Sequence, residues 1–84
     1  MERLAAVAHI VNVLAPYLGP TMAEASARVQ CEKLGITGEA ISAAQVEALI
    51  AKLASGLAVF VGRDTATTVV GEIRGRLAAH GKTA

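Results

Sequence analysis

The stretch from Ile41 to Gly62 constrains the fold more than any other part of the chain. Its apolar residues recur at intervals of three and four positions, which is the spacing of one buried face of a helix. They are Val46, Leu49, Ile50, Leu53, Leu57, Phe60 and Val61. Glu47 and Lys52 lie off this stripe, where water can reach them. The pattern predicts one long amphipathic helix over residues 43–61.

Both ends of this helix carry recognisable signals. Ser42 is a good N-cap, and Gln45 three residues later can complete a capping box. Ile41 precedes the cap and can pack against Val46 just inside the helix as a hydrophobic staple. Gly62 is the predicted stop, because glycine adopts the left-handed conformation that ends many helices. A β-hairpin over residues 57–70 is the local alternative, because strand-forming residues lie on both sides of Gly62.

Two further helices are predicted before the central one. The first covers residues 2–15 and ends or kinks at Pro16, which lacks an amide hydrogen. The second covers residues 20–34, because Pro20 suits a first helical position and Gly35 can follow the last turn. That ending would place Ile36 against Cys31. The first stripe is Leu4, Val7, Ile10, Val11 and Leu14, whereas Met22, Ala23, Ala27, Val29, Cys31 and Leu34 form no single clear face in the second.

A fourth helix is predicted over residues 65–80, with Asp64 as its N-cap and Gly81 as its end. Its stripe is Ala66, Val69, Val70, Ile73 and Leu77, and Glu72 and Arg76 are spaced as a favourable ion pair. Four helices joined by short loops predict an all-α, four-helix bundle-like fold, with residues 1–84 as a single domain.

Composition predicts that this domain associates with itself. The 84 residues are 54% hydrophobic and only 2% aromatic, so the core is aliphatic and small. A domain of this length leaves much apolar surface unburied, and three full apolar stripes exceed what the weak second helix can cover. We therefore expect a homodimer or a higher oligomer. The predicted interface lies on the last two helices, at Leu53, Leu57, Phe60, Val70, Gly71, Ile73, Gly75 and Leu77.

The charge and the cysteine content indicate which partners and which cellular compartment the sequence favours. The net charge of +1 gives no strong field toward nucleic acid or an anionic membrane. The single cysteine, Cys31, cannot form an internal disulfide, so a reducing cytoplasm is expected. The uncharged stretch from Leu4 to Ala23 is long enough to span a bilayer, but Pro16, Gly19 and Pro20 interrupt it. We expect a soluble helix and a turn there.

No catalytic constellation or metal-ligand spacing is visible, so no enzyme activity, cofactor or metal is predicted. His9 has no second His or Cys three or four residues away. Cys31 lies near a helix C-terminus, where the dipole disfavours a thiolate. We interpret both as structural residues. The third hypothesis for the protein is a small-ligand binder or an enzyme that uses them. Nucleic-acid binding through Arg63 and the basic end from Arg74 to Lys82, which includes His80, is the first alternative.

The segment VLAPYLGPTMAEASARVQCEKLGI, with its spacing to LASGLAVFVGRDTATTVVGEI, resembles small helical modules of bacterial signalling proteins. In those modules a Leu-Gly-Pro element opens a helix and a second glycine turn precedes the last helix. The matching residues here are Leu18-Gly19-Pro20 and Val61-Gly62. The resemblance implies a non-enzymatic protein-protein interaction or oligomerisation module, and it assigns no functional residues.

Overall fold

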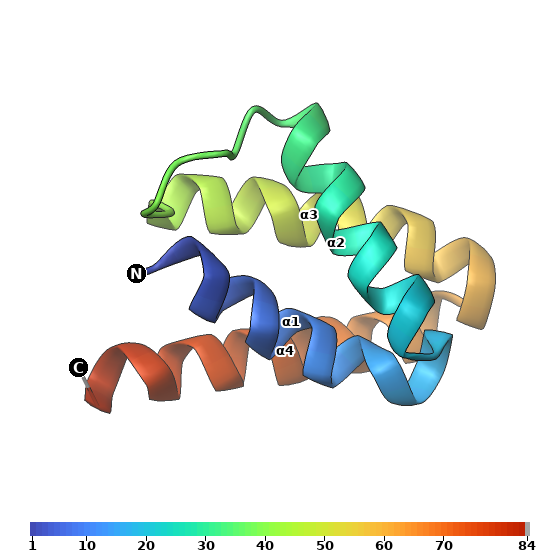
Figure 1. Ribbon diagram of the computed structural model, residues 1–84. Coiled ribbons are helices and arrows are strands. Elements are labelled where there is room, and N and C mark those ends of the chain that lie inside the picture. Colours follow the sequence, from blue (N-terminus) through green and yellow to red (C-terminus); the bar gives the residue numbers. More distant parts are fainter. Residues whose placement is uncertain (84) are drawn as a thin grey trace.

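The computed structural model describes the backbone of residues 1–83 and the side chains of residues 1–79. It contains four helices, α1 (Arg3–Leu18), α2 (Pro20–Lys33), α3 (Ala43–Val61) and α4 (Arg63–Thr83) (Figure 1). The predicted all-α, four-helix fold is therefore confirmed, and the central helix has the predicted bounds. Residues 57–61 end α3 and residues 63–70 begin α4, so the hairpin alternative is wrong.

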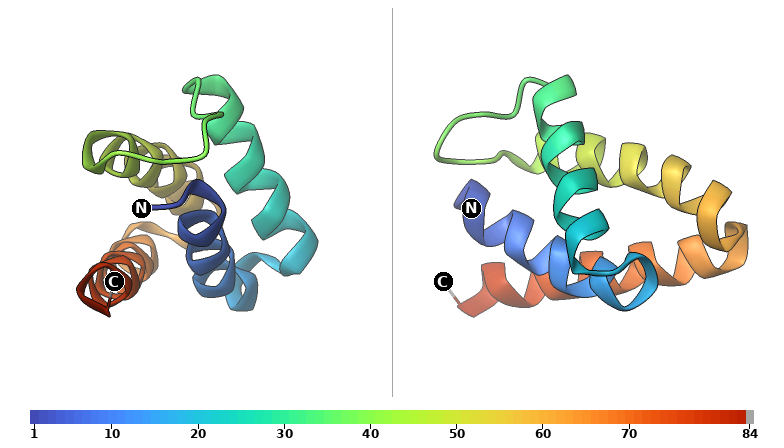
Figure 2. Two further views of the ribbon diagram at one scale, coloured as in Figure 1. Left: turned by 60° about the vertical axis from the view of Figure 1, so that its left-hand side comes forward. Right: turned by 45° about the vertical axis from the view of Figure 1, so that its right-hand side comes forward.

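The helices form a ring in which each one packs on two others: α1 on α2 and α4, and α3 on α2 and α4. The axes of α1, α3 and α4 follow roughly one direction, while α2 crosses them at a larger angle (Figure 2). The radius of gyration is 11.7 Å, close to the value of about 12 Å expected for a compact chain of this length. A single copy therefore closes around one core.

The start of α3 is fixed by the predicted capping box. The Gln45 backbone N–H donates to Ser42 Oγ at 3.1 Å, and the Ser42 N–H donates to Gln45 Oε1 at 2.9 Å. Ile41 before the cap is buried, and Val46 packs against the core. These four residues fix where the longest core helix enters the bundle.

The turn from α3 to α4 is made by Gly62 alone. Its φ of 92° confirms the predicted positive-φ stop, although its ψ of 158° lies outside the left-handed helical region. The Gly62 carbonyl already accepts from Ala66 N–H at 3.0 Å. Because one residue reverses the chain, α4 begins at Arg63, and the prediction of Asp64 as its N-cap is wrong. Asp64 lies in the first turn, where its negative charge suits the helix dipole.

The first helix does not end at Pro16, as predicted, but continues to Leu18. Proline so near the C-terminus removes one intrahelical bond, while Tyr17 and Leu18 beyond it pack on the core. Gly19 ends the helix instead, with φ 86° and its N–H bonded to the Ala15 carbonyl at 2.8 Å. The last helix likewise continues past Gly81 to Thr83, because a glycine within a helix costs only about 1 kcal/mol.

The end of α2 has the predicted geometry. Gly35 has φ 71°, and the Ile36 N–H donates to the Cys31 carbonyl at 2.8 Å, with both side chains buried. The loop that follows is tied to the N-terminus, which the sequence did not predict. Arg3 N–H donates to the Glu39 carbonyl at 2.8 Å, and Arg3 Nε donates to the Gly38 carbonyl at 2.6 Å.

The core lies where the four helices face each other, and it corrects two of the predicted stripes. In α1 the buried face is centred on Ala6, Ile10, Val13 and Leu14, and Leu4 is 66% exposed. This shift follows from packing, because α1 has neighbours on two sides, α2 and α4. In α3, Phe60 is 63% exposed. Phe60 lies in the last turn of α3, beyond the part of this helix that the neighbouring helices cover.

Candidate functional site

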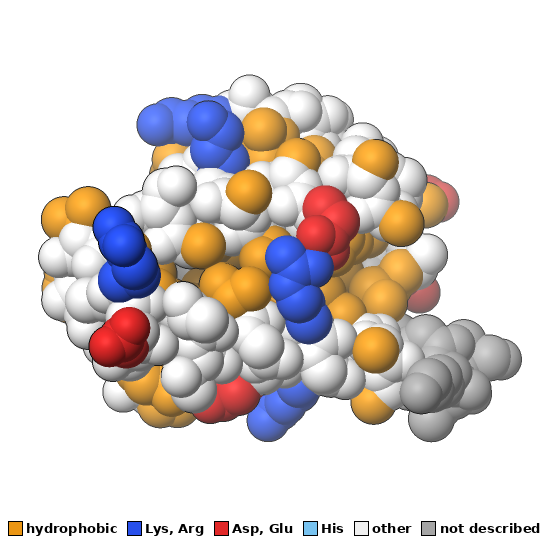
Figure 3. All heavy atoms as spheres, turned by 180° about the vertical axis from the view of Figure 1, so that it is seen from behind, with side chains coloured by type: hydrophobic (Ala, Val, Ile, Leu, Met, Phe, Trp, Pro, Cys, Tyr) orange, Lys and Arg blue, Asp and Glu red, His pale blue; other side chains and the backbone are white. Residues whose placement is uncertain are grey.

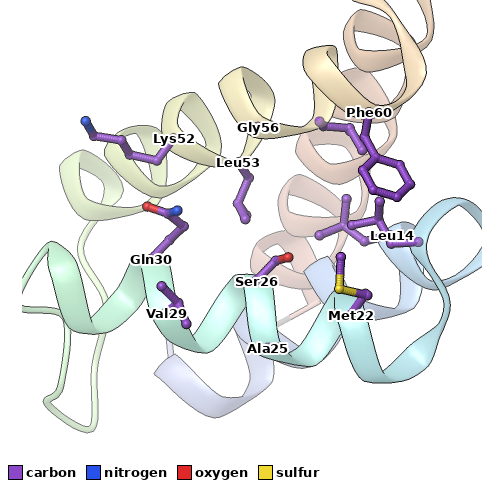
Figure 4. A pocket seen from close by; sticks show the side chains of 12 residues that line it. Leu14, Met22, Ala25, Ser26, Val29, Gln30, Lys52, Leu53, Gly56 and Phe60 are labelled. Carbon is purple, nitrogen blue, oxygen red and sulfur yellow. The ribbon is translucent and has the colours of Figure 1, made fainter.

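An apolar groove lies between α2 and α3. Its volume is about 330 Å³, at the lower end of the range for ligand pockets. Figure 4 shows α3 along one wall and α2 along the other, with Leu14 of α1 at one end. The lining residues are Leu14, Leu18, Met22, Ala25, Ser26, Val29, Gln30, Lys52, Leu53, Gly56, Leu57 and Phe60.

The groove exists because the residues that α2 buries are small. It buries only Ala23, Ala27 and Cys31, each four residues after the last. Of the neighbouring helix pairs, α2 and α3 pack least extensively. Gly56 on the α3 wall adds to the space, since a Cβ placed there would meet no atom within 4 Å. The two helices therefore leave an opening that their own side chains do not fill.

The two ends of the groove differ in chemistry. Met22 and Phe60 flank one end from opposite walls, and both are largely exposed. Gln30 and Lys52 flank the other end, again from opposite walls (Figure 4). Lys52 forms no ion pair with any side chain of residues 1–79. The groove is thus an apolar channel with an aromatic and thioether rim at one end and a single positive charge at the other.

Half of the large exposed hydrophobic residues among residues 1–79 lie at this groove. Three of them, Met22, Val29 and Phe60, lie on its rim, and the remaining ones among residues 1–79 are Met1, Leu4 and Val59. Scattered exposed apolar residues need no explanation, but a contiguous apolar patch marks an interaction site or a ligand groove. The face seen from behind in Figure 3 also shows hydrophobic side chains in a hollow, beside which an acidic and a basic side chain touch.

The structure divides the interface residues predicted from sequence into two groups. Leu53, Leu57, Ile73 and Leu77 belong to the core of a single copy, each at most 6% exposed. Phe60, Gly71 and Gly75 are exposed, and Val70 is half-buried. Leu53, Leu57 and Phe60 all line the groove, but the others lie on α4, away from it.

The predicted interface assumed that the apolar stripe of α4 stays uncovered in one copy, and the structure changes this assumption. The stripe of α4 is covered within one copy, since Ala66, Val69, Ile73 and Leu77 are buried. At Gly71 and Gly75, which were predicted to lie at the interface, an added Cβ would meet no atom of the same copy within 4 Å. Apolar surface is left over beside α2, and a shallow hollow lined by Ala54, Ala58 and Val70 remains between α3 and α4.

Cys31 and His9, the residues considered for chemistry, lie on different helices, α2 and α1. Cys31 is buried at the end of α2, and this burial raises the pKa of its thiol, an effect that the nearby Arg3 guanidinium opposes. His9 is half-buried on α1. The His80 side chain lies outside the described residues. Among the residues that the structure describes, no three His, Cys, Asp or Glu side chains gather as a metal site.

The charged residues of α4 make contacts that the sequence did not reveal. Arg74 Nη1 donates to both carboxylate oxygens of Glu47 on α3, at 2.6 and 2.5 Å. Glu72 accepts from the Tyr17 hydroxyl at 3.3 Å, whereas the sequence paired it with Arg76. The Glu72 charge raises the pKa of Tyr17. Arg63 is exposed at the corner between α3 and α4.

By length and composition alone, α3 is apolar enough to cross a membrane, with a mean hydropathy of 1.6. The core helix of a soluble protein has the same property, and α3 supplies Leu49, Ile50, Leu53 and Leu57 to the core. The segment that the sequence analysis considered, Leu4–Ala23, is divided at Gly19 between α1 and α2.

Sequence reasoning missed the α2 side of the groove. Met22, Ala25 and Val29 lie three and four residues apart on α2, and this spacing was a usable signal for a second apolar face. No protein-family model, curated protein or solved structure matches this chain.

Proposed function

We propose that this protein is a non-enzymatic interaction module that associates with itself, of the kind used in bacterial signalling, and that it acts in the cytoplasm. The observation that carries the proposal is the open apolar groove between α2 and α3, with Met22, Val29 and Phe60 exposed on its rim. Aromatic and methionine side chains are enriched at the centres of protein interfaces. A groove bounded by two helices is also a common way to receive apolar side chains of a partner.

The charge distribution supports a protein partner over nucleic acid. Only Lys52 among the groove residues carries a charge, and the protein as a whole has a net charge of +1. Interfaces between proteins are depleted of charge at their centre, whereas nucleic-acid sites need several cations against phosphate. Arg74, one of the cations in the alternative proposal, is already paired with Glu47.

Sedimentation velocity across the micromolar to millimolar range tests the proposal. We expect the mass to rise from that of one 8.6 kDa chain toward twice that value as concentration increases. The control is the same series at high salt, which should leave the association intact because apolar contacts are not screened. A mass that stays at 8.6 kDa across the whole range would refute self-association.

A further inference from the structure

We propose that the start of the chain and the loop between α2 and α3 form a strap that opens while the four-helix core stays folded, and that its opening controls access to the thiol of Cys31. The strap consists of residues 1–3 and residues 37–40. Neither these residues nor Cys31 lines the α2–α3 groove. The strap therefore opens whether or not the chain associates with itself.

Three hydrogen bonds close the strap. The Arg3 N–H donates to the Glu39 carbonyl at 2.8 Å, and the Ile41 N–H donates to the Met1 carbonyl at 2.9 Å. The Arg3 Nε donates to the Gly38 carbonyl at 2.6 Å, a bond that spans 35 positions of the sequence. The loop passes the N-terminal end of α1 in Figures 1 and 2, and these bonds hold the two segments together.

The strap takes the place of an N-cap for α1. The first N–H groups of a helix have no partner within the helix, and Glu2, at the N-cap position, makes no capping hydrogen bond through its side chain. The Glu39 carbonyl accepts from the Arg3 N–H instead. The first turn of α1 also has little apolar packing, since Leu4 is 66% exposed and Ala6 is the first buried residue of the helix. Opening of the strap therefore frays this turn.

The strap has the properties of a segment that opens locally. Such segments have few buried apolar contacts and backbone hydrogen bonds that water can reach. None of the residues 1–3 and 37–40 is buried, and their single β-bridge, between Glu2 and Ala40, belongs to no sheet. Ile36 and Ile41 on either side of the loop segment are at most 3% exposed. They anchor the loop on the core, so the opening is confined to the strap and the first turn of α1.

Cys31 lies in a hollow whose wall the strap completes. The hollow has a volume of about 390 Å³, and its wall includes Arg3 and Leu4 at the start of α1 and Thr37 in the loop. With the strap closed, Cys31 is buried, and this burial raises the pKa of its thiol. Opening moves Arg3 and Thr37 away from the hollow and admits water. The thiolate, which is the reactive form, then becomes accessible.

Arg3→Met tests the strap, because methionine keeps an apolar side chain but has no hydrogen-bond donor. The measurement is the rate at which excess N-ethylmaleimide labels Cys31, the single cysteine of the chain. We expect labelling to be about fivefold faster than in the wild type, as follows from the loss of one hydrogen bond. Electrostatics alone predicts the opposite sign. The Arg3 charge lowers the pKa of the Cys31 thiol, so its removal leaves less of the reactive thiolate.

Arg28→Met is the matched control. Arg28 lines the same hollow, but it forms no hydrogen bond or ion pair with any side chain of residues 1–79. We expect its labelling rate to equal that of the wild type. Equal acceleration by both variants would overturn the strap, because the two side chains would then merely cover the thiol. Unchanged or slower labelling in Arg3→Met would also overturn it.

Urea separates local opening from global unfolding, because the urea dependence of an opening scales with the surface that it exposes. Labelling below the unfolding transition should depend only weakly on urea. Hydrogen exchange gives a second measurement, in which the amides of Arg3 and Ile41 should exchange at least about tenfold faster than that of Leu53 in the core. Labelling that follows global unfolding at every urea concentration, or exchange of the strap amides as slow as that of Leu53, would show that the strap does not open by itself.

Discussion

Two leucines one turn apart on α3, Leu49 and Leu53, should respond differently to truncation to alanine. Leu49 is fully buried, and its removal leaves a closed cavity. Leu53 is 6% exposed and forms part of the groove wall, so the space it leaves opens to water. Buried Leu→Ala changes cost from about 2.7 to about 5.0 kcal/mol, and the cost increases with the residual cavity volume. We expect about 4–5 kcal/mol for Leu49→Ala and about 2.5–3 kcal/mol for Leu53→Ala.

Urea titrations followed by far-UV circular dichroism measure both free energies of unfolding. The protein must be dilute, because a second copy in the groove would bury Leu53 and increase its cost. A chain of this length has a total stability of about 4–13 kcal/mol, so Leu49→Ala removes a large part of it. Equal costs at the two positions, or a greater cost at Leu53, would refute the assignment of Leu49 to the closed core and Leu53 to the groove.

Three further predictions concern polar contacts and a turn. A double-mutant cycle on Glu47 and Arg74 should give a coupling of about 0.2–1 kcal/mol that decreases in high salt, because both side chains are half exposed; a coupling that salt does not reduce would contradict this. Spectrophotometric titration of Tyr17 should show a pKa above its ordinary value, and Glu72→Gln should lower that pKa. Since the pKa is raised on folding, the stabilisation from this hydrogen bond is complete below the pKa of unfolded tyrosine, near 10, and is lost as pH rises through the folded value; an unshifted pKa would exclude the contact. Gly35→Ala should destabilise the protein by about 1–2 kcal/mol in a urea titration, because its φ of 71° is unfavourable for alanine and no atom lies near the added Cβ; an unchanged midpoint would show that the turn tolerates another conformation.

Local chemistry in the sequence determined the helices and most of their ends. The capping box at Ser42 and Gln45, the positive-φ turn at Gly62 and the end of α2 at Gly35 each depend on residues within six positions of one another. Such signals are readable because their partners are close in sequence. Pro16 was misread because its local cost was judged without the packing of Leu18 on the core beyond it.

The periodicity of the sequence also identified the core face of α3 and α4, because helical spacing alone decides which residues share a side. Periodicity does not show how much of each apolar stripe a neighbouring helix covers. Leu4 and Phe60 both continue a stripe, yet both are exposed, since each lies at an end of its helix where the bundle offers no partner.

The existence and the width of the groove depend on the tertiary structure. Its width depends on the angle at which α2 crosses the bundle and on the small side chains at Ala23 and Ala27 that α2 buries. The pairing of Glu47 with Arg74 likewise joins residues on different helices. A sequence specifies which side chains are available on each helix face, but the angle and separation of two helices arise from the simultaneous packing of all four. The surface left open by that packing could therefore be located only once the chain was folded.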